Sequence, residues 1–129
     1  MSNERGKRMS IQLNNEFGTI EMSSDVISTV VGGAATEIYG IVGMASRKHV
    51  RDGINEILNR DNYSRGVVVR QENDQIAVDV YIIVSYGTKI TEVSKNVQER
   101  VRYQLEHDLG IVTDSVNVFV QGVRVLNEL

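Results

Sequence analysis

Residues 64–87 read SRGVVVRQENDQIAVDVYIIVSYG, and this stretch decides the fold class. Two runs rich in β-branched residues flank Asn73 and Asp74, which tolerate the backbone conformations of a tight turn. In the second run, alternate residues separate onto two faces. One face carries Ile76, Val78, Val80, Ile82 and Val84, and the other carries Ala77, Asp79, Tyr81, Ile83 and Ser85. The stretch therefore predicts two strands joined as a β-hairpin.

Two amphipathic helices are predicted on either side of this hairpin in the sequence. Residues 23–38 begin with Ser and Asp side chains that cap a helix, and then repeat apolar residues at helical spacing. Residues 88–110 repeat apolar residues in the same way until Gly110 ends the helix. Gly32 and Gly33 each cost the first helix on the order of 1 kcal/mol against alanine. Such a cost predicts the close approach of another backbone, and tight packing of the helix on the sheet is favoured over a ligand site.

Two further apolar segments predict additional strands. Residues 39–45 (YGIVGMA) have the length and character of a buried strand, and residues 115–125 (SVNVFVQGVRV) alternate as far as Gly122. Beyond that glycine the apolar alternation slips by one residue. A β-bulge at Gly122 would keep five valines on the core face. These are Val116, Val118, Val120, Val123 and Val125.

The order of elements predicts an α+β fold. We expect a two-layer sandwich, with two long helices packed on one face of a mixed sheet of about four to five strands. Residues 1–16 carry little that can be buried, so we expect a flexible N-terminal arm in which Ile11 and Leu13 add edge pairing. Residues 17–129 then form a single domain.

Composition narrows the functional classes. The chain has 129 residues, no cysteine and a formal net charge of −3, which argues against disulfides, thiolate metal sites and a dedicated nucleic-acid binder. No apolar run approaches the roughly 18 residues that cross a membrane. We therefore expect a cytoplasmic protein without direct membrane insertion.

The Gly-x-x-Gly pattern at Gly40–Gly43 can belong either to a phosphate-binding loop of an RNA-binding module or to a buried strand. In a KH-type module such a loop grips phosphates through polar or basic inner residues. Here the inner residues are Ile41 and Val42, which suit a buried strand. The basic cluster that follows contains Arg47, Lys48, His49 and Arg51. A solvated loop is the favoured interpretation of this cluster, and Arg47, Lys48 and Arg51 remain a candidate contact for an anion or an acidic partner.

Catalytic and cofactor motifs are not recognisable in the sequence. The two histidines, His49 and His107, lie in different predicted elements and form no pair with metal-ligand spacing. His107 falls in the last turn of the long helix, where a cation complements the helix dipole. The carboxylates of that helix alternate with lysine and arginine as on a solvated face. We therefore expect no enzyme activity, no cofactor and no metal.

The face of the hairpin opposite the helices offers a candidate interaction surface. Val68, Tyr81, Ile83 and Phe119 are predicted to share this face, and they form a larger apolar area than a monomer usually exposes. This face, or an exposed strand edge, is expected to mediate self-association or to bind a partner. An equally weighted alternative is that Ile54, Ile57 and Leu58 fold over the face as a small additional core.

Three stretches together resemble the alkaline shock protein family, the envelope stress response proteins of Gram-positive bacteria. They are YGIVGMA (39–45), VDVYIIVSYGTKITEVSKNVQERV (78–101) and LGIVTDSVNVFVQGV (109–123), and the likeness extends over about residues 17–125. The resemblance implies a small cytoplasmic α+β protein without established catalysis, associated with alkaline and envelope stress, in which some members are held near the membrane by other proteins. It also implies structural roles for a set of matching positions. These are Gly40, Val42, Gly43, Tyr86, Gly87, Val93, Val97, Asn117 and Gly122.

Residues and resemblance lead to one hypothesis and one alternative. The leading hypothesis is a non-catalytic interaction or scaffold protein of cell-envelope homeostasis and stress response. It would act through a protein partner, including a membrane-anchored one, or through homo-oligomers. The alternative is a small RNA-binding module that uses the basic loop at residues 47–51.

Overall fold

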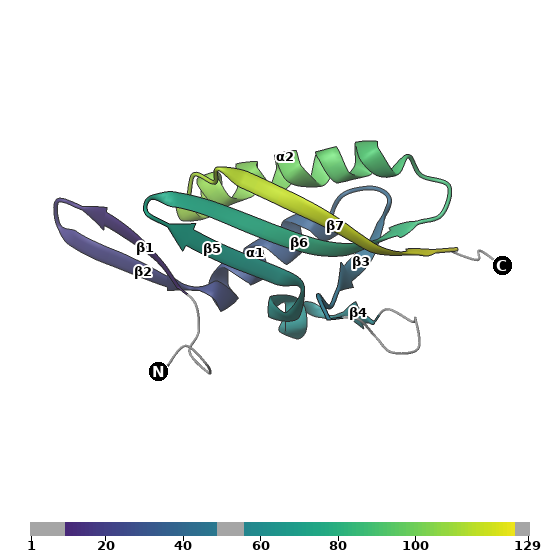
Figure 1. The fold of residues 1–129 in the computed structure, drawn as a ribbon, viewed down its shortest axis with the longest axis horizontal. Coiled ribbons are helices and arrows are strands. Elements are labelled where there is room, and N and C mark those ends of the chain that lie inside the picture. The colour runs from purple at the N-terminus through teal and green to yellow at the C-terminus, as the bar shows by residue number, and fades with distance from the viewer. Residues whose placement is uncertain (1–9, 49–55, 126–129) are drawn as a thin grey trace.

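The computed structural model describes residues 10–48 and 56–125 (Figure 1). Its elements, in chain order, are β1 (Ser10–Asn15), β2 (Gly18–Ser23), α1 (Ser24–Thr36), β3 (Ile41–Ala45), β4 (Ile57–Leu58), the 3₁₀ helix η1 (Arg60–Gly66), β5 (Val67–Glu72), β6 (Gln75–Ser85), α2 (Ile90–Leu109) and β7 (Ser115–Arg124). The predicted α+β class with a mixed sheet is confirmed. The helical part comprises α2 with 20 residues, α1 with 13 and η1 with 7.

Strand β6 is the centre of a five-stranded sheet. It pairs antiparallel with β5 and β3, and parallel with β7, while β4 pairs with β3. The turn between β5 and β6 contains Asn73 with a φ of 57°, a left-handed conformation that asparagine tolerates better than most residues. The hairpin predicted from residues 64–87 is therefore present, and its second strand, β6, lies at the middle of the sheet.

The predicted irregularity in the last strand is also present. Ile82 pairs with Val120 whereas Ile83 pairs with Gly122, so Gln121 is the extra residue of a bulge. The bulge returns Val123 to the face of Val84, its partner in the register. Val123 is thus on the core face as predicted but is 47% exposed, and Val125, which follows the paired residues, is 71% exposed. This end of the edge strand extends beyond the packed core.

One hydrophobic core joins both α-helices to the same face of β6. From α1 it takes Ile27, Val31, Ala34 and Ala35, from α2 Val93, Val97, Val101 and Leu105, and from β6 Ile76, Val78, Val80, Ile82 and Val84. Most of the apolar positions predicted from helical spacing therefore pack, but Val26 and Ile90, at the starts of α1 and α2, are 45% and 39% exposed. The Ser23 hydroxyl accepts from the Val26 amide at the start of α1, and Gly110, with a φ of 71°, ends α2.

Gly32 makes a close approach of a different kind from the one expected. A Cβ atom at this position would lie 2.2 Å from Cδ2 of Tyr63, so the glycine accommodates an aromatic ring of η1. The atoms nearest to Gly32 therefore belong to the side chain of Tyr63, which is distant in sequence, whereas a backbone was predicted there. Gly33 has open space at the corresponding position.

The N-terminal region requires a correction. Residues 10–15 form β1, which pairs with β2 in a hairpin that extends from the body of the molecule (Figure 1). Ile11 is 1% exposed and belongs to the core. The side-chain amide of Gln71 donates to the Gln12 carbonyl and accepts from the Gln12 amide, at 3.2 and 3.1 Å, which fastens the hairpin to β5. A flexible arm over residues 1–16 is therefore wrong for residues 10–15, and residues 1–9 lie outside the described chain.

Candidate partner-binding surface

We define the outer face as the side of the sheet opposite α1 and α2. In Figure 1 this face is turned towards the viewer and α1 lies behind it. The register places side chains from β5, β6 and β7 on it, because paired residues of adjacent strands share a face. They include Val68 and Arg70, Ala77, Asp79, Tyr81 and Ile83, and Asn117 and Phe119.

The structure brings the predicted interaction residues onto this one face but gives them different exposures. Tyr81 pairs with Phe119, and their rings stack with centroids 4.8 Å apart and an interplanar angle of 16°. Phe119 is 42% exposed, while Val68 and Tyr81 are half-buried. Ile83 is fully buried within the chain, so its inclusion in an exposed face is wrong. The accessible aromatic group is therefore the Tyr81–Phe119 pair.

Among the described residues predicted to cover the outer face as a small additional core, Ile57 lies on that face but is 41% exposed. Ile57 pairs with Ala45, and its Cγ2 would lie 2.7 Å from a Cβ added at Gly43, which itself pairs with Ile83. Leu58 belongs instead to the main core, and Ile54 lies outside the described residues. Gly43 therefore makes room for Ile57, which explains a glycine in a buried strand without a phosphate loop.

A polar cluster across three strands lies beside the aromatic pair. The Asp79 carboxylate accepts from Arg70 Nη2 at 2.5 Å and from Asn117 Nδ2 at 2.9 Å. Its side chain is only 14% exposed. Such charge-assisted hydrogen bonds fix the three side chains relative to each other. Sequence analysis missed this cluster, because it placed Asp79 on this face without identifying its partners.

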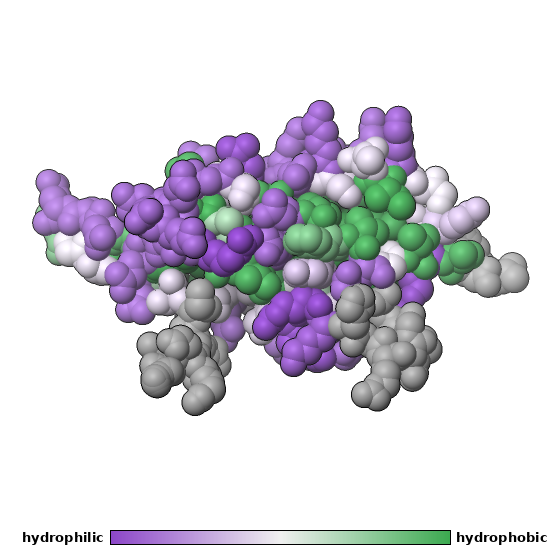
Figure 2. All heavy atoms as spheres, in the orientation of Figure 1, coloured by the Kyte–Doolittle hydropathy of each residue, from purple (hydrophilic) through white to green (hydrophobic). Residues whose placement is uncertain are grey.

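The surface view agrees with this arrangement. Figure 2 shows a hydrophobic band along β6 and β7 on the outer face, with hydrophilic atoms on both sides of it. An apolar strip with polar borders is typical of a protein-binding surface.

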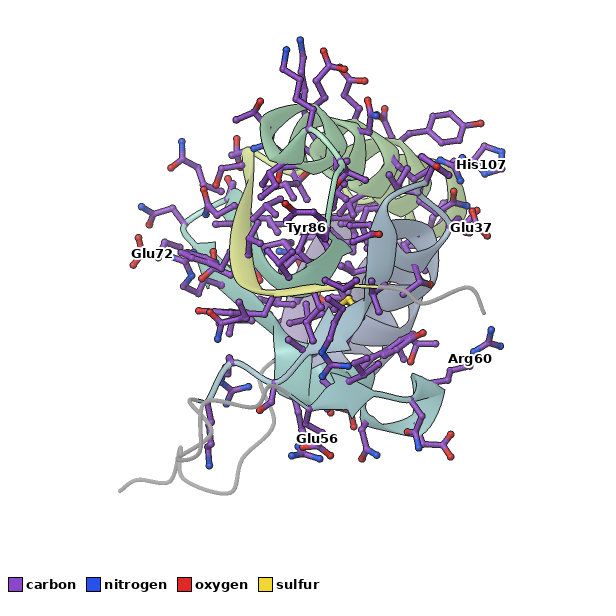
Figure 3. The ribbon with its side chains drawn as sticks, turned by 90° about the vertical axis from the view of Figure 1, so that its right-hand side faces the viewer. Glu37, Glu56, Arg60, Glu72, Tyr86 and His107 are labelled. Carbon is purple, nitrogen blue, oxygen red and sulfur yellow. The ribbon has the colours of Figure 1, made fainter. Side chains whose placement is uncertain are left out.

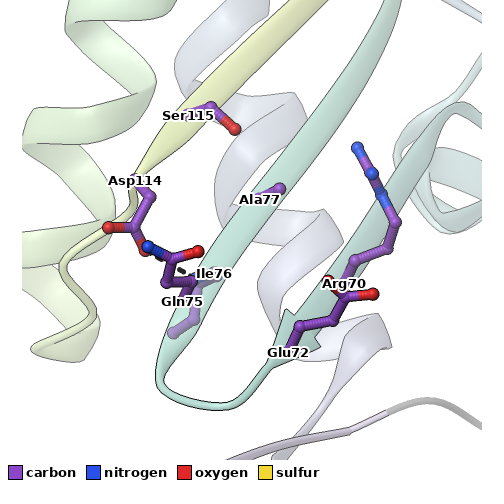
Figure 4. Close-up of a pocket in the computed structure, with 7 residues that line it drawn as sticks. All are labelled: Arg70, Glu72, Gln75, Ile76, Ala77, Asp114 and Ser115. Carbon is purple, nitrogen blue, oxygen red and sulfur yellow. Dashed lines mark hydrogen bonds between the residues drawn. The ribbon is translucent and has the colours of Figure 1, made fainter.

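A shallow pocket of about 110 Å³ lies at the end of the outer face near the β5–β6 turn (Figure 4). Its lining includes Arg70, Glu72 and Ser115. The Asp114 carboxylate at its border accepts from the Ile76 amide at 2.7 Å, and the Asp114 amide donates to the Ile76 carbonyl. These groups hold the start of β7 against β6, so the carboxylate has a structural partner.

The candidate anion-binding loop is only partly described. The Arg47 amide donates to the Arg65 carbonyl at 2.9 Å, and its guanidinium donates to the Ser64 carbonyl at 3.5 Å. Lys48 is exposed, and Arg51, like His49, lies outside the described residues. Arg47 therefore fastens the segment after β3 to η1, which is a structural use of its side chain.

His107 lies far from the outer face, near Glu37 in the end-on view of Figure 3, whereas Glu72 is on the opposite side. Its ring stacks on Tyr103 and its Nδ1 lies 2.9 Å from Asp108 Oδ1. A hydrogen bond from Gln104, and to a smaller extent one from His107, lowers the pKa of the Asp108 carboxyl.

Across residues 10–48 and 56–125, no three His, Asp or Glu side chains gather as metal ligands would. Neither α-helix within these ranges has the length and apolarity of a membrane span.

The chain is similar in sequence to known bacterial proteins over nearly its whole length. It is 57% identical over 119 residues to YloU of Bacillus subtilis (strain 168), covering 92% of this chain and 99% of that protein. It is 52% identical over 120 residues to Spy1614 of Streptococcus pyogenes serotype M6, covering 93% and 99% of the two chains. Among solved structures, a MamM CTD variant superposes with a TM-score of 0.46 at 13% identity, covering 81% and 87%.

The alkaline shock protein family also matches nearly the whole of the described chain. The match spans residues 12–125, from the first strand of the N-terminal hairpin to the end of β7. This family is described as having a cell envelope-related function. The chain belongs to the alkaline shock protein family.

Proposed function

We propose that the protein is a non-catalytic interaction protein in cell-envelope homeostasis and the alkaline stress response, and that it binds a protein partner through the outer face. In this proposal α1 and α2 form one layer, the sheet forms the second, and the partner covers the free side of the sheet. The protein acts in the cytoplasm, close to the membrane when its partner is anchored there. The family's envelope-related description supports this setting.

The observation that carries the proposal is the stacked pair of Tyr81 and Phe119 on the outer face. Large aromatic side chains contribute most to protein interfaces when they are centrally placed and already ordered. Phe119 is ordered by its stacking on Tyr81 and is still 42% exposed. The neighbouring Asp79 cluster adds polar groups that are held in place before binding, which reduces the entropy lost on association.

Replacement of Phe119 by lysine tests this function. Each tagged variant is purified from gently cross-linked cells, and co-purifying proteins and RNA are measured in the same eluate. Loss of an aromatic anchor at the centre of an interface costs about 2 kcal/mol or more, so we expect about a thirtyfold or greater loss of the partner. The matched control is Tyr103→Lys, which removes an aromatic side chain that is 60% exposed on α2 and should retain the partner.

Thermal unfolding must show that both variants remain folded. Capture of the same partner by folded Phe119→Lys at the wild-type level would refute binding through the outer face. Enrichment of RNA that disappears in an Arg47→Ala/Lys48→Ala variant would instead support the RNA-binding alternative.

A further inference from the structure

The outer edge of β7 is open to another strand. The Gln98 side chain donates to the Val116 carbonyl at 2.9 Å, so the peptide groups of Val116 are directed away from β6. Alternate residues of a paired strand direct their peptide groups to the same side, so Val118 and Val120 also face outward. Within the described chain, no strand pairs with these outward groups. The open positions are therefore two residues that flank Phe119.

The open section carries no charge that would repel an identical strand. Residues 115–123 contain no charged residue and no proline, and four of the nine are valine. Edges are usually protected by lysine, proline or a bulge, because uninterrupted edges pair with other chains. Here Gln98 closes the edge at Val116, and the bulge at Gln121 ends it on the other side. The open section is therefore short, uncharged and defined in position.

The positions of the open residues favour a second copy of β7 as the occupant. Two identical strands pair antiparallel about a two-fold axis that passes between the same residue of both copies. With the axis at Phe119, Val118 of each copy lies opposite Val120 of the other copy. Each of these two facing pairs exchanges hydrogen bonds between outward peptide groups. The edge is therefore its own complement in this register.

Other axes leave one open residue without a suitable partner. About an axis at Val118, Val120 would pair with Val116, whose carbonyl already accepts from α2. About an axis at Val120, Val118 would pair with Gly122, which lies beyond the bulge and directs its peptide groups at β6. Only an axis at Phe119 therefore satisfies both open residues.

This register also brings the exposed aromatic rings together. Phe119 lies opposite Phe119 of the second copy in a pair without mutual hydrogen bonds, where Cα atoms are about 4.5 Å apart and side chains are close. Each Phe119 already stacks on its own Tyr81. The two outer faces together would thus carry a row of four rings, and Phe119, which is 42% exposed in the single chain, would gain an apolar neighbour.

The space between the edge and α2 can receive the end of the second strand. In this register, residues 121–124 of the second copy continue beside residues 114–117. An open groove of about 360 Å³ lies at residues 114–117, and its other wall is formed by side chains of α2, Gln98 among them. The pairing therefore has room at the point where Gln98 reaches the edge.

We propose that two copies of the chain pair antiparallel through β7, with the two-fold axis at Phe119. The pairing joins two five-stranded sheets into one continuous sheet. It also places both Tyr81–Phe119 pairs at the centre of one larger outer face. The inference goes beyond the proposed function, because a partner of the outer face would then bind a dimer, but the pairing itself does not require that partner.

A single introduced cysteine tests the position of the axis. The chain contains no cysteine, so Phe119→Cys can form a disulfide only with a second copy. Facing residues about 4.5 Å apart have the Cα separation that a disulfide needs. Under a mild oxidant, we expect Phe119→Cys to form covalent dimers at least about tenfold faster than Val123→Cys, because the two Val123 positions would lie about 25 Å apart along the paired strands. Tyr103→Cys, on the exposed side of α2, is the control for random collision.

Backbone hydrogen exchange of the unmodified chain measures the pairing without a substitution. When the protein concentration rises about a hundredfold, the Val118 and Val120 amides should exchange at least about tenfold more slowly, because each gains a hydrogen bond in the dimer. The Phe119 amide, which is directed at β6, should be protected at every concentration.

Either of two results would overturn the inference. One is disulfide formation by Phe119→Cys that is no faster than in both control variants. The other is exchange of the Val118 and Val120 amides that does not change with protein concentration. Partner capture that depends on Phe119, combined with either result, would reject the dimer and retain the proposed function. A dimer shown by both methods, together with wild-type partner capture by folded Phe119→Lys, would do the reverse.

Discussion

Replacing Ile83 by alanine is expected to lower the free energy of unfolding by about 2 to 5 kcal/mol, the usual cost of this truncation in a close-packed core. Ile83 lies on the outer face, which carries no helix, yet it is fully buried. Its register partners are Gly43 on β3 and Gly122 on β7, and neither of these has a side chain. The neighbouring residues therefore have little capacity to fill the cavity. Urea-induced unfolding measures the change.

The matched control is Val123→Ala on the adjacent strand β7, where the side chain is 47% exposed. It should change stability by only about 0.5 kcal/mol. If Ile83→Ala instead left stability unchanged and abolished partner capture, Ile83 would belong to an interface and the assignment to the core would be wrong.

Two adjacent glycines in α1 are expected to respond to alanine in opposite directions. In Gly32→Ala the new methyl group would lie 2.2 Å from the Tyr63 ring, and Tyr63 is only 9% exposed. Overpacking of this kind costs about 1 to 3 kcal/mol, which exceeds the gain of nearly 1 kcal/mol in helix propensity. Gly33→Ala meets no atom within 4 Å, so it should stabilise the protein by about 0.5 to 1 kcal/mol.

Thermal unfolding of the two single variants under identical conditions checks this prediction. The melting temperature should fall for Gly32→Ala and rise for Gly33→Ala. A rise in both variants would mean that the Tyr63 ring moves aside at little cost, and that the close contact does not determine the residue at position 32.

Much of the fold could be predicted because local patterns agree with the tertiary packing. The stripe along α2 that includes Val97 and Val101 is the stripe that packs on the sheet. The turn at Asn73 and the bulge before Gly122 follow from the backbone preferences of these residue types. In each case a few neighbouring residues carry the whole signal.

The errors arise where distant residues decide the outcome. The alternation around Ile11 and Leu13 indicated strand pairing, which β1 shows, but not that the body of the fold would bury Ile11. Alternation placed Ile83 correctly on the outer face but could not show that β3, β4 and β7 would bury it there. The ring that fills the space at Gly32 comes from Tyr63, 31 positions later in the chain. Packing between such distant segments leaves no local pattern.

The candidate surface was predictable only where it follows from alternation within a single strand. Tyr81 and Phe119 were assigned to one face from alternation within each strand. Their stacking depends on the parallel register of β6 with β7, which the sequence does not reveal.

The central position of β6 also has a consequence for folding kinetics. The β5–β6 hairpin closes across two residues and can form within microseconds, whereas each β6–β7 pair joins positions nearly 40 residues apart. Closing the longer loop carries a larger entropic cost and tends to occur late. During synthesis β6 is made before α2 and β7, so its edge stays bare until they follow. A nascent chain at this stage exposes an apolar strand to aggregation, and protection by a chaperone would matter most in that interval.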